Sequence, residues 1–314
     1  MTPHEAEIVP PDSVSAANVL DRTVPSPTKT PFFQAIHAQR YQRQALIKNI
    51  QKRSGRQLIC YVSGARCAIE RGDTLPFVDL LHNVPPNVDL DLLLHTGGGD
   101  IDAAEKLISM VRRKVGMNTL RIIVPDFAKS AGTLMVLGAD WVVMSNSSEL
   151  GPIDPQIVMS DSNGNRIQHS VRSYLDAYDE HTAMLKKDPE NIGAQIMLGK
   201  LDPATVILFQ GVLKRAGQLA EELLKRGMFR NAGLWSQTAG ELLDTKRWRS
   251  HSQMISWEDA QDKRLGLIVE YLEPASDAWQ EYWQLYCLQR LAIQDRQKLF
   301  ESDYASLLID GLSA

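Results

Sequence analysis

Two apolar runs that end in very small residues constrain the fold of this chain most. Residues 90–94 continue into His-Thr-Gly-Gly-Gly-Asp, and residues 120–124 lead into Ala-Lys-Ser-Ala-Gly-Thr. A segment with helical spacing follows each run, and 101–115 is the longer of the two. Strands that alternate with helices over short links predict a right-handed parallel sheet. The two small-residue loops then lie at the carboxyl ends of neighbouring strands, where α/β sheets place their chemistry.

Further elements are expected on both sides of this core. Periodicity and turn residues predict helices over 32–53, 75–83, 101–115, 131–138, 168–187, 203–226, 235–243 and 257–263, and strands over 58–63, 90–94, 120–124, 141–144 and 265–269. We interpret 168–187 and 203–226 as an insertion beside the sheet. Residues 278–308 are predicted to form one long C-terminal helix. Its aromatic residues form a stripe suited to core packing or to a subunit interface, namely Trp279, Tyr282, Trp283 and Tyr286.

These elements divide the chain into three parts. Residues 1–30 are rich in proline, serine and threonine and have few large apolar groups, so we expect a disordered tail. Residues 31–275 are expected to form a single α/β domain. Residues 276–314 contain the predicted C-terminal helix, with a role in packing or oligomerisation.

Composition and charge narrow the class of protein. Of the 314 residues, 44% are apolar and 23% are charged, and the formal net charge is −4. Because no basic stripe is present, nucleic acid is not expected as a partner. The three cysteines, Cys60, Cys67 and Cys287, lack metal-binding spacing and fit a reducing cytoplasm.

No apolar run approaches the roughly 20 residues that cross a bilayer. No signal peptide is visible, so we expect a cytoplasmic protein without a membrane span or a metal.

The second loop places a serine where a strand is expected to meet a helix. A serine hydroxyl becomes a nucleophile when a base removes its proton and N–H groups receive the oxyanion. Ser130 fits the first role. The N–H groups of Gly98 or Gly99 and of Ala131 fit the second, since glycine lets backbone approach a ligand closely. Structural alternatives exist: small residues also suit a tight strand–helix crossing, and three glycines also form a flexible turn or an anion loop. A Walker loop is excluded because no Gly-Lys-Ser/Thr follows.

Three motifs together resemble one family. They are Leu-His-Thr-Gly-Gly-Gly at 94–99, Ala-Lys-Ser-Ala-Gly-Thr at 128–133 and Leu-Gly-Pro-Ile-Asp-Pro-Gln at 150–156. They are similar to motifs of the serine dehydrogenase proteinase family, whose members are serine proteinases of the Clp fold. That family is related to Clp protease, to signal peptide peptidase A and, more distantly, to the crotonases. The resemblance covers most of the chain, although Gly97 stands where the family usually has proline. It implies an α/β fold: a Clp/crotonase-like parallel sheet with flanking helices, a helical insertion and a long C-terminal helix.

The resemblance also implies roles for individual residues. It makes Ser130 the nucleophile and places Gly98, Gly99 and Ala131 in the oxyanion region. It does not supply the general base, because Ile-Asp-Pro occupies 153–155, where Clp protease has its histidine. His95, directly before the glycines, is expected to orient the loop rather than to take a proton.

The base is therefore sought elsewhere in the sequence. Signal peptide peptidases use a later lysine, which makes Lys186 and Lys187 candidates if burial lowers the pKa of one of them. The alternative for this pair is a solvated helix C-terminus, where lysine suits the helix dipole. His251 is the rival base, because imidazole needs no large pKa shift. Lys200 is a remote candidate, and Lys129 is discounted because neighbouring side chains at a turn usually diverge.

Together these features predict a serine peptidase. Its substrate would be an extended peptide or protein segment laid along the strand edge beside the glycine loop. No metal or organic cofactor is needed, and a homo-oligomer is expected. An ATPase partner, if there is one, must be a separate chain because no Walker motif is present. The alternative is a non-proteolytic peptide-binding scaffold or an acyl-thioester enzyme on the same fold, which the missing histidine motivates.

Overall fold

The computed structural model describes residues 29–160, 166–230, 233–244, 246–248 and 250–311. The chain forms two compact units, Met1–Ala38 and Gln39–Ala314. The predicted tail, residues 1–30, lies almost wholly outside the described residues. The helix predicted over 32–53 is two helices, α1 (Pro31–Ile36) and α2 (Ala38–Ser54). They are separate because His37 leaves the helical region, with φ −101° and ψ 14°.

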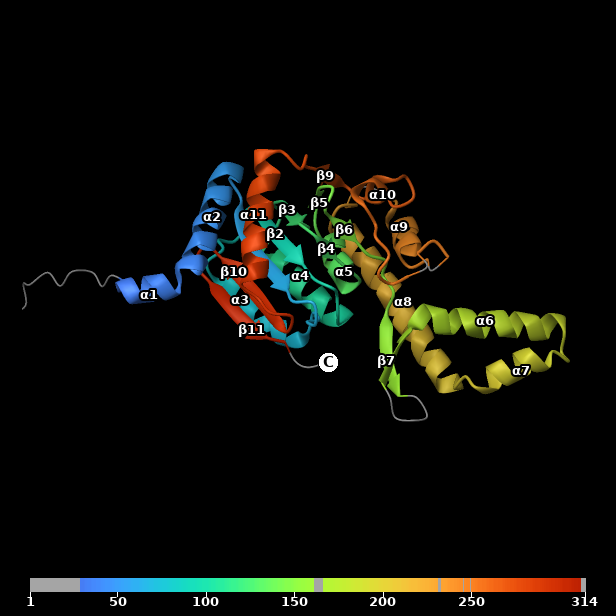
Figure 1. Ribbon diagram of the computed structural model, residues 1–314. Helices are drawn as coiled ribbons and strands as arrows, with labels where there is room; N and C mark the ends of the chain where they lie inside the picture. Colours follow the sequence, from blue (N-terminus) through green and yellow to red (C-terminus); the bar gives the residue numbers. More distant parts are fainter. Residues whose placement is uncertain (1–28, 161–165, 231–232, 245, 249, 312–314) are drawn as a thin grey trace, which may run out of the picture. The chain divides into compact units, whose positions relative to one another are not determined.

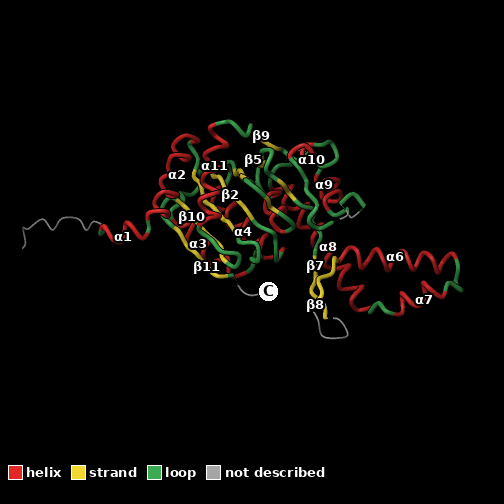
Figure 2. The backbone as a smooth tube through the Cα atoms, in the orientation of Figure 1, coloured by secondary structure: helices red, strands yellow, loops and turns green. Residues whose placement is uncertain are grey.

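A mostly parallel sheet forms the centre of the second unit (Figures 1 and 2). Its strand order is β11-β10-β1-β2-β3-β5-β9. The parallel strands are β1 (Gln57–Ser63), β2 (Leu90–His95), β3 (Leu120–Ile123), β5 (Trp141–Met144) and β9 (Val269–Tyr271). This arrangement confirms the predicted parallel sheet over residues 58–144, with nearly the predicted strand bounds.

Alternation along each parallel strand gives the sheet two buried faces. On β2, Leu92 joins the larger core with α3 (Thr74–His82), α4 (Ile101–Val115), α5 (Ala131–Leu137) and α8 (Pro203–Arg226). Its neighbour Leu93 joins the opposite core, beneath α2 and α11 (Asp277–Leu291). Strands buried on both faces read as continuous apolar runs, which is why the parallel strands were recognisable in the sequence.

The prediction of one long C-terminal helix over 276–314 is wrong. The helix α11 ends at Leu291, and an antiparallel hairpin of β10 (Gln297–Ser302) and β11 (Ser306–Asp310) follows it. The hairpin adds to the sheet beside β1, where Phe300 stacks on Tyr61 with ring centroids 4.9 Å apart. Pairing with β1 is a long-range contact that overrides local helical spacing. The aromatic stripe on α11 serves core packing, since Trp279, Tyr282 and Tyr286 are buried.

An arm leaves the sheet between the GPIDPQ loop and α8 (Figure 1). It begins with a hairpin of β7 (Gln156–Ser160) and β8 (Arg166–Ser170) and continues through α6 (Val171–Lys187) and α7 (Ile192–Gly199). The helix predicted over 168–187 therefore starts at Val171, and neither the hairpin nor α7 was predicted. The arm has a small core of its own, made of Val171, Leu175, Val206 and Phe209. The remaining elements are β4 (Phe127–Ala128), β6 (Glu149–Leu150), α9 (Trp235–Leu242) and α10 (Trp257–Gln261).

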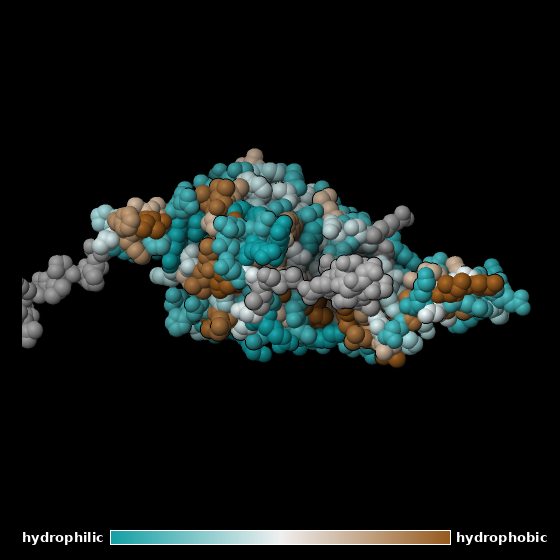
Figure 3. Space-filling view, turned by 60° about the horizontal axis from the view of Figure 1, so that its bottom comes forward, coloured by the Kyte–Doolittle hydropathy of each residue, from teal (hydrophilic) through white to brown (hydrophobic). Residues whose placement is uncertain are grey.

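The arm also carries exposed apolar side chains. Figure 3 shows an apolar patch on it, to which Ile192, Ile196 and Met197 of α7 contribute. No single helix within the described ranges has the length and hydropathy to cross a membrane. The helices α7 and α8 meet both criteria only as a pair, and the pair is bent by 77° at its break.

Candidate active site

Backbone pairing brings the glycine loop and the serine loop together. The N–H of Thr96 donates to the carbonyl of Phe127 at 3.1 Å, and the N–H of Lys129 donates to the carbonyl of Thr96 at 3.0 Å. These two bonds pair Thr96 in parallel with Ala128 of β4 (Phe127–Ala128), beyond the ends of β2 and β3. The loops therefore lie side by side, as the sequence predicted for the carboxyl ends of neighbouring strands.

Ser130 occupies a strained backbone position at the start of α5. Its φ is +52° and its ψ is −114°, and only Asn87 shares a positive φ among the described non-glycine residues. Such a conformation costs of order 1–3 kcal/mol and persists where the surrounding structure enforces it. A serine on a sharp strand-to-helix turn presents its hydroxyl away from both elements, as nucleophilic serines do. Within the described ranges, this hydroxyl has no hydrogen-bond partner.

Two backbone N–H groups next to Ser130 are available to receive an oxyanion. Among the described residues, the N–H groups of Gly99 and Ala131 have no acceptor. The N–H of Gly98, in contrast, donates to Thr96 Oγ1 at 3.2 Å. Of the three predicted oxyanion residues, Gly99 and Ala131 therefore offer donors. Gly98 instead permits the close approach of the two loops, because a Cβ there would lie 3.2 Å from the nitrogen of Ala131.

A histidine and an aspartate complete the set of reactive groups. Nδ1 of His251 lies 3.6 Å from Oδ2 of Asp154, too far for a hydrogen bond, and it has no hydrogen-bond partner within the described ranges. The other oxygen of Asp154 accepts a hydrogen bond from Ser170 Oγ at 2.8 Å. Asp154 is 8% exposed. A buried carboxylate beside one imidazole nitrogen orients the ring and leaves the other nitrogen to act as a base.

The segments that bear Asp154 and His251 are fixed to the serine loop. Residue Leu150, before the GPIDPQ loop, pairs with Ile255 through two backbone bonds of 2.9 and 3.0 Å. Thr133 Oγ1, one turn into α5, lies 2.8 Å from the carbonyl oxygen of Gly151. This polar bond holds the start of the loop against the helix that Ser130 begins.

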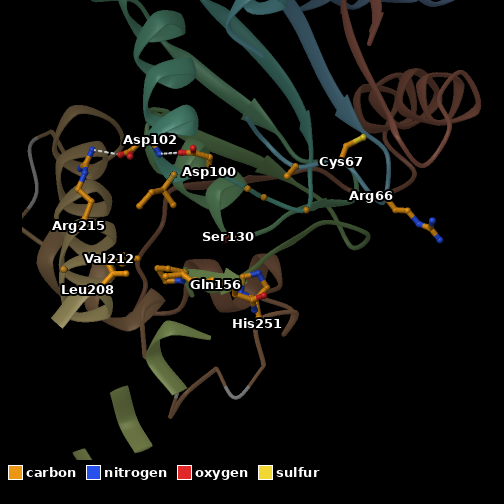
Figure 4. A pocket seen from close by; sticks show the side chains of 18 of the residues that line it. Arg66, Cys67, Asp100, Asp102, Ser130, Gln156, Leu208, Val212, Arg215 and His251 are labelled. Carbon is orange, nitrogen blue, oxygen red and sulfur yellow. Dashed lines mark hydrogen bonds and ion pairs between the residues drawn. The ribbon is translucent and has the colours of Figure 1, made fainter. Parts of the chain in front are cut away.

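The glycine loop, Ser130 and His251 line one cavity (Figure 4). Its volume is about 1160 Å³, and Ser130, the three glycines, Gln156 and His251 line it. The opposite wall is α8, which contributes Ile207, Leu208 and Val212. Arg215, also on α8, forms ion pairs with Asp102 and Glu105 of α4 and so ties that wall to the helix after the glycine loop.

The structure does not bring the predicted lysines to this cavity. Lys186 and Lys187 are exposed in the last turn of α6, which matches the alternative of a solvated helix C-terminus. Lys200 is exposed at the end of α7. None of the three is among the residues that line the cavity. A lysine base needs a buried position next to the serine, and these three lysines are exposed outside the cavity.

Lys129 is buried beside Ser130, but its ammonium group binds other residues. Its Nζ lies 3.0 Å from Oε1 of Glu149 and 3.1 Å from the carbonyl oxygen of Leu150. It also reaches the carbonyl oxygens of Ser252 and Gln253 at 3.5 and 3.4 Å. One buried ammonium thus connects the segments before Asp154 and after His251.

His95 lies on the other side of the loop and packs against α11. Its Nδ1 is 3.2 Å from the hydroxyl of Tyr286, and its ring lies 4.1 Å, between centroids, from Phe127. Burial, followed by the charge of Arg290, lowers the pKa of His95 to about 3. The neutral imidazole thus contacts Tyr286 and Phe127 and is not among the residues that line the cavity of Ser130.

Asp154 is the residue that sequence reasoning missed. The Clp pattern predicts a histidine at this position, and an aspartate does not fit that pattern. A carboxylate within the proline-stiffened sequence Gly-Pro-Ile-Asp-Pro-Gln was the available signal. A short rigid loop fixes a side chain well enough to orient a partner from a distant part of the chain.

Sequence comparison finds similar proteins. Residues 69–196 match the ClpP-like SDH-type serine proteinases. The match covers this segment, which is less than half of the chain. The segment contains Ser130, the glycine loop and Asp154, whereas His251 lies beyond it. The predicted fold class, a Clp/crotonase-like α/β sheet with flanking helices and a helical insertion, is confirmed apart from its C-terminal helix.

Two archaeal relatives share part of the sequence. One uncharacterized protein of Methanocaldococcus jannaschii is 28% identical over 199 residues, which are 63% of this chain and 59% of that protein. A second from the same organism is 33% identical over 94 residues, 30% of this chain and 28% of that protein. The chain therefore matches well under two thirds of the length of either relative.

Two solved structures are similar at low identity. The membrane-bound stomatin-specific protease 1510-N is 14% identical, with a TM-score of 0.40, over 68% of this chain and 80% of that one. ClpP1 from Listeria monocytogenes is 11% identical, with a TM-score of 0.37, over 74% of this chain and 96% of that one.

Proposed function

We propose that the protein is a serine endopeptidase in which Ser130, His251 and Asp154 act together. The observation that carries this proposal is that His251 lines the same cavity as Ser130 while its Nδ1 lies 3.6 Å from the buried Asp154. When this separation of 3.6 Å closes to a hydrogen bond, Asp154 holds the Nδ1–H tautomer and Nε2 is free to accept the proton of the serine hydroxyl. Apo geometry of such sites is often loose, and the remaining distances close around the substrate.

The reaction follows from the positions of these groups. Ser130 Oγ attacks the carbonyl carbon of a peptide bond as its proton passes to His251. The carbonyl oxygen becomes an oxyanion, which the N–H groups of Gly99 and Ala131 stabilise. His251 then donates its proton to the leaving amine, and an acyl-enzyme remains on Ser130. Water, activated by the same imidazole, hydrolyses the acyl-enzyme and restores the serine.

A fluorophosphonate probe tests the nucleophile. The probe phosphonylates only an activated serine, so the wild type is expected to form an adduct on Ser130 that intact-mass measurement detects. Ser130→Ala should form none. Absence of an adduct on folded wild-type protein would refute an activated serine. It would favour the second candidate, a peptide-binding or acyl-thioester protein that uses only the two N–H groups.

We also propose that the protein acts as a homo-oligomer on peptide or protein substrates. The buried aromatic stripe on α11 does not provide the interface. Exposed Ile192, Ile196 and Met197 on α7 support the proposal instead, since an apolar patch on a projecting arm favours association. Sedimentation velocity should show a single assembly larger than one chain, and Ile196→Glu should reduce its size. A wild type that sediments as a monomer at all concentrations would exclude this proposal.

A further inference from the structure

The glycine loop is held from outside by a segment that precedes α3. The N–H of Ile69 donates to the carbonyl oxygen of Gly98 at 2.7 Å, and the N–H of Asp100 donates to the carbonyl oxygen of Ile69 at 2.9 Å. Gly99 lies between these two bonds, so close that a Cβ on it would be 2.4 Å from the nitrogen of Ile69. In a parallel pairing of this kind, the N–H of the middle residue points away from the partner. Ile69 therefore sets the direction of the Gly99 N–H.

A buried ionic cluster fixes the residues next to Ile69. The chain turns through the 3₁₀ segment Arg71–Asp73, and Asp73 Oδ2 accepts the N–H of Glu70 at 3.0 Å. Lys298 Nζ reaches this turn from β10 and lies 2.5 Å from Glu70 Oε1 and 2.8 Å from Asp73 Oδ1. Tyr61 OH donates to the other oxygen of Asp73 at 3.2 Å.

The burial of this cluster makes it rigid. The side chain of Lys298 is 1% exposed and that of Asp73 is 3% exposed. Water cannot replace either partner, and removing one member leaves the other charge buried and uncompensated. The turn therefore keeps its position only while Lys298 is present. The serine peptidase reaction proposed above does not use this lysine.

We propose that Lys298 is a positioning residue for the oxyanion hole, which it controls through the Glu70–Asp73 turn and Ile69. The C-terminal hairpin thereby determines where the Gly99 N–H points. This inference rests on the proposed function for its catalytic consequence. The structural part of the inference, that Lys298 fixes the position of the glycine loop, depends only on the observed contacts.

A matched control lies three residues along the same strand. Glu301 is also fully buried, and it pairs with Arg43 of α2 at 2.9 Å. Because adjacent side chains on a strand alternate between faces, Glu301 lies on the face of the sheet opposite Lys298. Glu301→Gln therefore disturbs a buried ion pair of the same hairpin without touching the glycine loop.

Saturation kinetics of fluorophosphonate inactivation test the catalytic part. Removal of one oxyanion donor costs about 10²–10³ in rate, and Lys298→Met displaces a donor without deleting it. We expect the maximal inactivation rate to fall about 10- to 100-fold on that scale, with the half-saturating probe concentration unchanged. Glu301→Gln should keep the wild-type rate. A wild-type rate in folded Lys298→Met, or an equal loss in Glu301→Gln, would overturn the proposal.

Hydrogen exchange tests the mechanical part without relying on activity. The amides of residues 97–100 should exchange faster in Lys298→Met than in the wild type or in Glu301→Gln. If the wild type fails to react with the probe, the proposed function is refuted. The exchange result alone then tests whether Lys298 holds the glycine loop in place. Unchanged exchange in Lys298→Met overturns it. Should Lys298→Met not fold, the double variant Lys298→Met/Asp73→Asn carries the same measurements, because it leaves no unpaired ion at position 73.

Discussion

Gly98 lies directly against Ser130. A Cβ atom on Gly98 would come within 2.8 Å of the Cβ atom of Ser130 and within 2.8 Å of the carbonyl oxygen of Lys129. The φ of Gly98 is +103°, a region that residues with side chains rarely adopt. This contact brings the glycine loop against the serine loop, as the proposed oxyanion site at Gly99 and Ala131 requires.

The first prediction concerns this contact. Gly98→Ala should reduce the rate of fluorophosphonate labelling by at least about 10²-fold, the scale on which an oxyanion donor contributes. The methyl group forces the two loops apart and strains the backbone. Gly97→Ala is the matched control, because a Cβ at Gly97 meets nothing within 4 Å. Equal labelling of the two variants would contradict the close approach described above.

The second prediction identifies the base. His251→Ala and Asp154→Asn should each lower the rate of peptide hydrolysis by about 10⁴-fold, because the first removes the proton acceptor and the second favours the wrong tautomer. Lys186→Ala and Lys187→Ala should leave the rate unchanged, since both side chains are exposed outside the cavity. Steady-state kinetics on a fluorogenic peptide measure all four. Loss of activity in a lysine variant, with His251→Ala active, would reverse the assignment.

The third prediction concerns the structural role of Lys129. Lys129→Met should lower the free energy of unfolding by about 1–3 kcal/mol, because it leaves buried acceptors without a donor. Denaturant titration measures the loss. Arg226→Met is the control: Arg226 pairs with Glu222 across an exposed helix face, at 62% and 48% side-chain exposure, and such pairs contribute about 0–1 kcal/mol. A loss no greater than that of the control would show that Lys129 does not hold the two segments.

The fourth prediction concerns pH. The pKa of His95 is lowered from 6.5 to about 3, chiefly by burial. Between these values the unfolded chain binds one more proton at this residue than the folded chain does. The contribution of His95 to the free energy of unfolding is therefore fully present above the unfolded pKa. It is lost as the pH falls, with a slope of about 1.4 kcal/mol per pH unit.

His95→Gln tests that slope. Between pH 6.5 and 3, the free energy of unfolding of the variant should depend less steeply on pH, by the equivalent of one bound proton. Denaturant midpoints at several pH values measure this dependence. Its stability at pH 7 also decreases, because the contact between His95 and Tyr286 is changed. A slope equal to that of the wild type would mean that His95 is protonated in the folded protein.

Much of the sheet and half of the site could be predicted from local patterns. The strands over 57–63, 90–95 and 141–144 are buried on both faces, so each reads as an apolar run of the right length. The two loops follow from the order of these strands along the chain. The sequence alone therefore pairs Ser130 with Gly98 or Gly99.

The remaining parts depend on contacts between distant segments. The strand β10 forms because residues 297–302 pair with β1, although the sequence from 278 onwards has helical spacing. His251 reaches the cavity of Ser130 because Ile255 pairs with Leu150. Neither pairing leaves a periodic signal in its own segment.

The sequence by itself thus determined the parallel sheet, the glycine loop and the serine, since each depends on the order and size of neighbouring residues. Only the tertiary structure decided which candidate base lines the cavity of Ser130 and what holds the glycine loop. Both outcomes depend on which buried charged groups lie next to each other in the fold. Lys129 pairs with Glu149, Lys298 pairs with Asp73, and His251 lies beside Asp154 at the cavity. A buried ion is stable only with its partner in place, and the fold as a whole sets that distance.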